Sequence, residues 1–287
     1  MQNTLKGFNT AVIKHEDHFL ALLLKVKSQN DICQTYYLQA PHLADLCLIL
    51  QSRINLVAQR ISEEGDTYKE KLNNINEIII AETPEIEISE IEEPDSGQRI
   101  TSLTFAPGNA SAKIVAVLQN KKNIIFNIDD TQVDALSVAI QQALINSNEN
   151  DLMQNIYFDM KYLMLYTVDL SKEKNISYQQ HIQEDWKTTL YKNYLAILFC
   201  FETPQGKKIL TGAIVKINSQ HPSAETNTII SRVLDNHSKL NVNDEGYSPH
   251  EIYSNIMPTP PGKILTLPEC LNALHHFYRE MNTKLPG

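Results

Sequence analysis

The sequence predicts an α+β protein in which antiparallel strand groups are each followed by a packing helix, and in which the C-terminal half mixes helices with a hairpin. Two regions, residues 8–39 and 99–129, each contain three short apolar runs rich in β-branched and aromatic residues, separated by polar breaks. Each region is followed by apolar residues at helical spacing. With 287 residues, 42% of them hydrophobic, the chain is long enough for two cores. We therefore expect domains at 1–147 and 148–287.

The first region predicts a three-stranded antiparallel meander and then one long helix. The runs 8–15, 18–27 and 32–39 are the expected strands. Pro41 favours a helix start, because a residue in the first turn has no intrahelical partner for its N–H in any case. Apolar residues then recur at helical spacing, which indicates a buried stripe. The members of this stripe are Leu43, Leu46, Leu50, Val57 and Ile61.

Residues 82–97 change composition abruptly, with glutamates alternating with isoleucines and no basic residue. We expect an acidic connector that contains one edge strand, since like charges discourage pairing between strand edges. The alternative is a docking strip for a basic partner. In both interpretations the segment joins the two strand-and-helix units of the N-terminal domain.

The second strand-and-helix unit of the N-terminal domain has expected strands at 99–108, 111–120 and 123–129. Asp129 and Gln132 have the spacing of a capping box, in which each side chain binds the other residue's free backbone N–H. The helix that follows has a predicted stripe at Val133, Leu136, Ile140 and Leu144. The two strand-and-helix units share the spacing of their apolar residues around the helix start. This indicates either a duplication or convergence on the same strand, cap and helix pattern.

The C-terminal half predicts helices at 149–170 and 178–195, a hairpin at 194–217 and a helix at 223–240 that starts at Ser223. Loops are expected at 240–251 and 257–262. A last helix is expected after Thr266, which forms a second capping box with Glu269.

Four segments, "KGFNTAVIKH", "HLADLCLILQSRI", "FETPQGKKIL" and "LTLPECLNAL", resemble the YjeJ-like family of uncharacterised enterobacterial proteins. The similarity extends over most of the chain. It implies a bacterial, cytoplasmic protein, and it supplies no catalytic residues.

Composition narrows the classes of function. A formal charge of −9 opposes binding to nucleic acid. A single-strand-binding sheet would need exposed aromatics beside basic residues, and Tyr36 and Tyr37 have few basic neighbours in the sequence. The four cysteines form no C-x-x-C pair, and glycine-rich phosphate-binding patterns are lacking, so we expect no cofactor. The start has no signal-peptide pattern and no apolar run could span a bilayer, which predicts a cytoplasmic protein without membrane contact.

Two groups of residues are candidates for chemistry. His15, Asp17 and His18 are close in sequence, but H-E-x-H differs from the H-E-x-x-H spacing that places two imidazoles on one helix face. We interpret them as a polar turn and a weak metal candidate. His181, Glu184 and Asp185 combine a base with two acids beside Trp186, and they are the candidate catalytic residues of a hydrolase.

Neither group has the spacing of a known catalytic motif. The sequence therefore favours a non-enzymatic cytoplasmic binding or regulatory protein that acts through protein contacts, including self-association as a homodimer. The alternatives are an enzyme of hydrolase type and a single-stranded nucleic-acid-binding protein.

Overall fold

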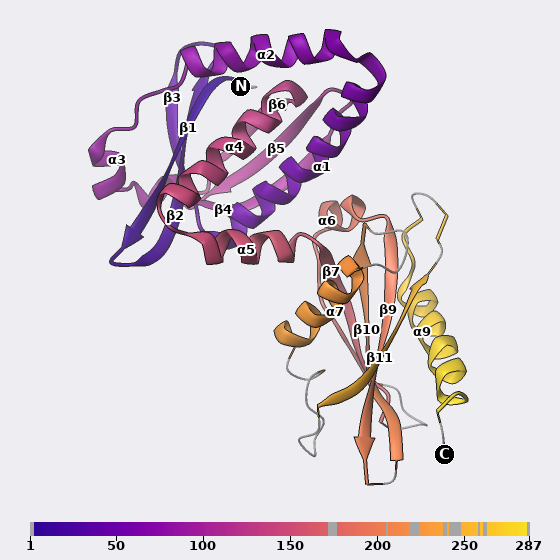
Figure 1. Ribbon diagram of the computed structural model, residues 1–287. Helices are drawn as coiled ribbons and strands as arrows, with labels where there is room; N and C mark the ends of the chain where they lie inside the picture. Colours follow the sequence, from indigo (N-terminus) through magenta and orange to yellow (C-terminus); the bar gives the residue numbers. More distant parts are fainter. Residues whose placement is uncertain are drawn as a thin grey trace. The chain divides into compact units, whose positions relative to one another are not determined.

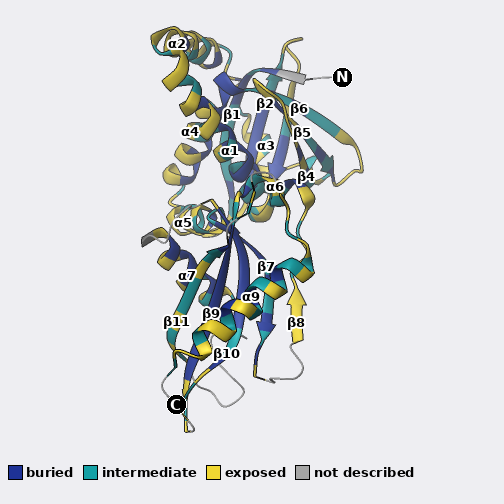
Figure 2. Ribbon diagram, turned by 90° about the vertical axis from the view of Figure 1, so that its right-hand side faces the viewer, coloured by how far each residue is buried: buried dark blue, intermediate teal, exposed yellow. Residues whose placement is uncertain are grey.

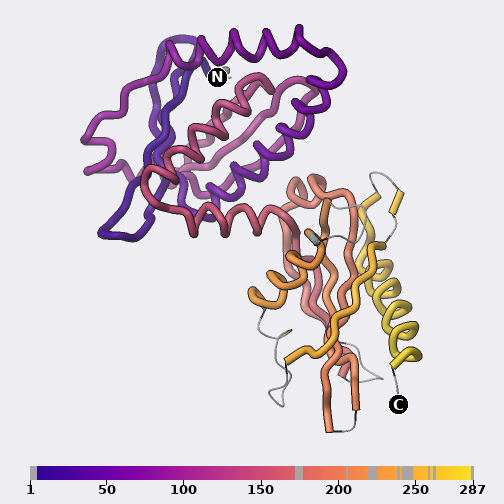
Figure 3. Tube along the Cα trace, viewed as in Figure 1, coloured from indigo at the N-terminus to yellow at the C-terminus, as the bar shows by residue number. Residues whose placement is uncertain are grey.

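The computed structural model describes residues 3–171, 177–204, 206–218, 224–237, 240, 248–257, 259–260 and 263–285. The chain forms two compact units, Met1–Met160 and Lys161–Gly287. It completes the first unit before it enters the second, as the colour order in Figure 3 shows. The domain boundary predicted after residue 147 stays a prediction, because compactness does not establish independent folding.

The first unit contains two three-stranded antiparallel meanders, each followed by a helix (Figure 1). The first consists of β1 (Asn3–His15), β2 (His18–Ser28), β3 (Cys33–Leu38) and α1 (Ala40–Glu64). The second consists of β4 (Ile100–Pro107), β5 (Ser111–Leu118), β6 (Asn123–Asp129) and α4 (Asp130–Asn146). The predicted α+β class with strand groups and packing helices is confirmed. A duplication of the two halves stays a prediction.

A short parallel pairing joins the two meanders into a sheet of order β3-β2-β1-β6-β5-β4. Asn3 of β1 pairs with Phe126 of β6, and Thr4 pairs with Asn127. At the other ends of the meanders, a parallel bridge links Tyr37 of β3 to Arg99, the residue before β4. The outer strands of the two meanders therefore also approach each other.

Helices α1 and α4 contact each other and the sheet, and α2 (Asp66–Ala81) contacts both α4 and β1. The predicted stripes are buried except for Ile61, which is half-buried. The capping box of Asp129 and Gln132 is present. Burial of each aliphatic side chain stabilises the unit by about 1.5–3 kcal/mol, which explains why these faces hold the helices on the sheet.

The acidic connector contains no edge strand, so that prediction was wrong. Residues 82–97 instead contain the short helix α3 (Ile88–Glu92), and a 3-10 turn, η1 (Ser96–Gln98), starts at their end. Glu87 and Glu90 form a capping box that satisfies backbone donors at the start of α3. The alternation of Glu and Ile is typical of a half-buried strand, but the capping box of Glu87 and Glu90 favours a helical turn here. The unit ends with α5 (Asn150–Asp159).

The second unit is built on an antiparallel sheet of order β11-β9-β10-β7-β8. Its strands are β7 (Tyr162–Asp169), β8 (Ser177–Gln180), β9 (Asn193–Thr203), β10 (Gly206–Ile217) and β11 (Pro249–Met257). The predicted hairpin is confirmed as β9 and β10. Figure 2 shows both strands buried along most of their length.

Alternating residues of β9 enter two different cores. Leu195, Ile197 and Phe199 pack with residues of α7 (Ala224–Asn236). Tyr194, Ala196 and Leu198 pack with residues of α9 (Leu267–Asn282), whose capping box of Thr266 and Glu269 is present. A central strand between two helical layers explains why this segment is apolar at nearly every position.

Three predictions in this half were wrong. The helix expected at 149–170 ends at Asp159, and its remainder is strand β7, paired with β10. Within 178–195 only α6 (Asp185–Leu190) is helical, between β8 and β9. The loop expected at 240–251 gives way to β11 at Pro249. The spacing of apolar residues in a short run does not distinguish a helix from a strand, so contacts with the rest of the unit determined these elements. The expected cap Ser223 lies outside the described residues.

None of the described helices combines the length and the hydrophobicity that crossing a membrane requires.

Candidate functional site

Lysines of the first meander hold the acidic connector against the sheet. Glu82 binds Lys27 of β2 at 2.6 Å and Lys6 of β1 at 3.1 Å. Glu90 binds the buried Lys25 of β2 at 2.7 Å. The hydrogen bond from Lys27, followed by that from Lys6, holds the pKa of Glu82 below its usual value. These two glutamates therefore neutralise charges of their own unit and are not available to a partner.

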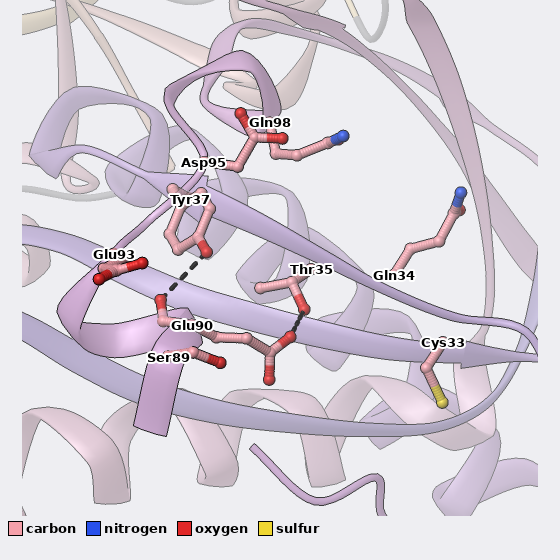
Figure 4. Close-up of a pocket in the computed structure, with 9 residues that line it drawn as sticks. All are labelled: Cys33, Gln34, Thr35, Tyr37, Ser89, Glu90, Glu93, Asp95 and Gln98. Carbon is pink, nitrogen blue, oxygen red and sulfur yellow. Dashed lines mark hydrogen bonds between the residues drawn. The ribbon is translucent and has the colours of Figure 1, made fainter. Parts of the chain in front are cut away.

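A polar pocket of about 430 Å³ lies between strand β3 and the acidic connector (Figure 4). We call it the β3–connector pocket. Strand β3 supplies one wall, and α3 with the following turn supplies the other. The lining residues are Cys33, Gln34, Thr35, Tyr37, Ser89, Glu90, Glu93, Asp95 and Gln98.

Glu90 fixes the two walls of the pocket to each other. Its carboxylate accepts hydrogen bonds from Thr35 of β3 and from Lys25. Its backbone carbonyl oxygen accepts a hydrogen bond of 3.1 Å from the hydroxyl of Tyr37, whose side chain is buried. Burial opposes ionisation of Glu90, but the hydrogen bonds from Lys25 and Thr35 outweigh it, so the pKa of Glu90 is lowered. The pocket is therefore a pre-formed feature.

Two further carboxylates distinguish one end of the pocket. Figure 4 shows Glu93 and Asp95 on either side of the Tyr37 ring, with Cys33 and Gln34 at the opposite end. Asp95 Oδ1 accepts a hydrogen bond of 2.8 Å from the backbone N–H of Gly97. Glu93 is exposed, and no bond to its carboxylate is found within the described part of the chain. Glu93 and the second oxygen of Asp95 therefore present negative charge to a ligand.

This charge distribution suits a cation with several N–H donors. Ammonium and guanidinium groups donate three and five hydrogen bonds, and such charge-assisted bonds to carboxylates are about twice as strong as neutral ones. A metal ion fits less well, since among the described residues no group of three or more His, Cys, Asp or Glu side chains could hold one. The pocket can therefore receive a lysine, an arginine or another organic cation.

The weak metal candidates lie in the turn between β1 and β2. His15 ends β1, His18 begins β2, and the two are paired across the hairpin. Both histidines and Asp17 are exposed. The intervening Glu16 has a φ of 54°, the left-handed conformation that a tight turn requires. The structure thus places these residues in a solvated hairpin turn.

The catalytic candidates of the second unit have different partners. Glu184 precedes α6 and accepts a hydrogen bond of 2.9 Å from the indole N–H of Trp186. Asp185 is exposed in the first turn of α6. The ring of His181 instead lies 5.1 Å from that of His237. His237 was not among the residues predicted from the sequence, because nothing local relates residues so far apart in the chain.

The aromatic residues considered for base stacking are not accessible. Tyr36 is 1% exposed and packs edge-to-face on Phe126 at 5.2 Å, and Tyr37 is 5% exposed. Stacking with bases requires an exposed ring face, so neither tyrosine provides a platform for nucleic acid.

The fold and the pocket define a class of α+β proteins made of two units, the first of which combines two meander-and-helix halves with an acidic connector. The chain belongs to the YjeJ-like family, whose model matches residues 1–284. Among curated proteins, it is similar to "Uncharacterized protein YjeJ" of Escherichia coli (strain K12), with 27% identity over 285 residues, covering 99% of this chain and 98% of the relative. No solved structure matches.

Proposed function

We propose that this protein is a non-enzymatic, cytoplasmic binding protein that acts through protein contacts and takes a basic side chain of its partner into the β3–connector pocket. The observation that carries the proposal is the pair of available carboxylates, Glu93 and Asp95, beside the buried Tyr37. Their position next to a pre-formed cavity distinguishes them from glutamates scattered over the surface.

The energetics indicate what kind of partner is needed. A hydrogen bond to a charged group contributes about 1.5–3 kcal/mol, whereas an exposed ion pair contributes about 0–1 kcal/mol. One basic side chain in this partly open pocket therefore provides only part of a useful affinity, because association itself costs several kcal/mol. The partner should be a protein that also contacts the rim of the pocket.

The composition of the pocket supports binding over catalysis. Of the described residues that line it, none is a histidine, lysine or arginine. The most enclosed carboxylate, Glu90, is already bonded to Lys25 and Thr35. A general acid–base mechanism needs a pair of groups whose proton affinities differ and which both reach the substrate. Besides Glu90, the lining offers the carboxylates of Glu93 and Asp95, the Cys33 thiol and the Tyr37 hydroxyl, and this hydroxyl already donates to the Glu90 carbonyl oxygen.

The same proposal predicts a homodimer if the partner is a second copy of this chain. Lys121 and Lys122 are exposed in the turn between β5 and β6, so each is a cation that a second copy could receive. Sedimentation velocity over a range of protein concentrations measures this directly. A molar mass that stays at that of the 32.6 kDa monomer at every concentration removes the homodimer and leaves a different protein as the partner.

The test uses peptides selected from a random library on the full-length protein. Selected peptides should contain Lys or Arg, and replacing that residue by Gln should weaken binding at least tenfold. The double variant Glu93→Gln/Asp95→Asn should lose a similar factor, because both changes remove charge while the asparagine oxygen still accepts from Gly97. The matched control is Glu70→Gln/Glu77→Gln, which removes two exposed charges from α2.

Binding by the control should equal that of the unmodified protein, and added salt should weaken binding. The proposal fails if the selected peptides lack basic residues, if no peptide is enriched, or if the pocket variant binds as tightly as the control.

A further inference from the structure

Strand β3 is an edge of the six-stranded sheet, and its free side borders the β3–connector pocket. In the order of this sheet, β3 has β2 as its only strand neighbour. Cys33, Gln34 and Thr35 of β3 line the pocket. An edge strand presents backbone N–H and C=O groups that can pair with another chain. The pocket therefore gives a partner access to backbone groups as well as to carboxylates.

The hairpin of β2 and β3 determines which backbone groups of β3 face away from β2. The N–H of Ser28 donates a hydrogen bond of 3.0 Å to the carbonyl oxygen of Ile32, and the pairing of the two strands continues from there without a shift of register. In an antiparallel ladder, hydrogen-bonded pairs alternate with pairs that are not hydrogen-bonded. Gln34 therefore bonds to β2, whereas Cys33 and Thr35 direct their N–H and C=O groups toward the free edge.

One end of this edge already holds a neighbouring backbone segment. By the same alternation, Tyr37 also directs its backbone groups outward, and it forms a parallel bridge with Arg99. Within the described part of the chain, no comparable backbone partner is found for Cys33 or Thr35. The edge of β3 is therefore closed at Tyr37 and open at Cys33.

The connector determines the charge that an added strand should carry. Thr35 and Tyr37 share one face of β3, and the hydroxyl groups of both donate hydrogen bonds to Glu90 of the connector. Side chains of an added strand that lie opposite these two residues would share that face. Figure 4 shows Glu93 and Asp95 there, beside the Tyr37 ring. Every second residue of the added strand should therefore be Lys or Arg.

We propose that the partner protein binds through an extended segment that adds a strand to the free edge of β3, with basic side chains at alternate positions facing the connector. This inference rests on the proposed function and specifies the conformation and the residue pattern of the partner. Hydrogen bonds to the backbone of Cys33 and Thr35 provide affinity that is independent of sequence, and Glu93 and Asp95 select the basic side chains.

The probe is a capped hexapeptide, Lys-Val-Lys-Val-Lys-Val, titrated calorimetrically into the full-length protein. Its matched control, Lys-Lys-Lys-Val-Val-Val, has the same composition and charge without the alternation and should bind at least tenfold more weakly. Methylation of the backbone nitrogens of one alternate set, either the lysines or the valines, should abolish binding, whereas methylation of the other set should be tolerated. The reason is that only alternate N–H groups of an added strand face its neighbour.

The matched variants of the protein are Cys33→Pro and Cys33→Ser. Cys33 is the first residue of β3, where a proline is tolerated, and its N–H faces the free edge. The proline removes this donor and the serine keeps it, so Cys33→Pro should bind the alternating peptide at least tenfold more weakly than Cys33→Ser. Circular dichroism establishes that both variants are folded.

A second measurement needs no substitution. In amide hydrogen exchange of the unmodified protein followed by NMR, saturating peptide should slow exchange at Cys33 and Thr35 at least tenfold and affect Gln34, which already donates to β2, much less.

The proposal is overturned if the alternating peptide does not bind, if both peptides or both Cys33 variants bind alike, or if exchange at Cys33 and Thr35 is unchanged. If one of these results is found while Glu93→Gln/Asp95→Asn still weakens the binding of the selected basic peptides, strand addition is wrong and the proposed function stands.

Discussion

Asp130 is the carboxylate whose loss should most weaken the first unit. It is the first residue of α4 and is fully buried. Arg53 of α1, which is 2% exposed, donates to its two oxygens at 2.7 and 2.8 Å. Arg60 of α1 pairs with the same carboxylate at 2.8 Å. One carboxylate therefore pairs with two guanidinium groups and fixes the two long helices to each other.

The perturbation is Asp130→Asn, which preserves shape but removes the charge. It also replaces one acceptor oxygen by an NH₂ group that faces a guanidinium donor. Breaking a buried ion pair by removing one partner costs about 3–5 kcal/mol. If the amide nitrogen takes the place of Oδ2, the hydrogen bond from Arg53, worth about 1.5–3 kcal/mol, is lost together with the ion pair of Arg60, which agrees with that range. We expect the free energy of unfolding of this unit to fall by about 3–5 kcal/mol.

The assay is urea denaturation followed by far-ultraviolet circular dichroism. The single tryptophan, Trp186, belongs to the second unit, so its fluorescence follows that unit separately. The control is Asp134→Asn, the same chemical change at an exposed position of α4, which should alter stability by no more than about 0.5 kcal/mol. If Asp130→Asn costs less than about 1 kcal/mol, the buried ion-pair network does not stabilise the unit as reasoned.

Three other predictions concern separate features. Gly7→Ala should destabilise the protein by about 1–3 kcal/mol in urea, because an added Cβ would overlap the backbone carbonyl of Glu82; unchanged stability would contradict the packing. Cys33, the exposed thiol, should react rapidly with a disulfide reagent in the folded state. The buried thiols of β9 and α9 should react only after unfolding, so Cys33→Ser should abolish the rapid reaction. Hydrogen bonds from Lys263, then from the helix start, lower the pKa of Glu269 to about 2. Its stabilisation of α9 is therefore complete above about pH 4.5 and is lost as pH falls through about 2, and a ¹³C titration midpoint near 4.5 would refute this.

The two meander-and-helix halves of the first unit were predictable because their local signals agree with their tertiary structure. Strand β5 faces the core with alternate residues, α1 starts at a proline, and α4 starts at the capping box of Asp129. Segment 162–169 lacked this agreement. Its apolar residues continue the spacing of the preceding helix, and only pairing with β10 makes them a strand.

The site was less predictable, because its partners are far apart in the chain. The acidic composition indicated a surface for a basic partner, but Glu82 and Glu90 are bonded to lysines 55 and 65 residues away. Of the described residues that line the pocket, Glu93 and Asp95 keep charge available. In the same way His181 was recognised, whereas its neighbour His237 depends on how α7 packs.

The pairing of β1 with β6 has a consequence for synthesis on the ribosome. The side chain of Gln132 donates a hydrogen bond of 2.8 Å to the carbonyl oxygen of Leu5, across 127 residues of sequence. At about 5–20 residues per second, a nascent chain needs roughly 6–25 s to translate that interval. Until then the edge of β1 near Asn3 lacks its final neighbour and can pair with other chains. The first meander should therefore be the segment that chaperones protect during translation.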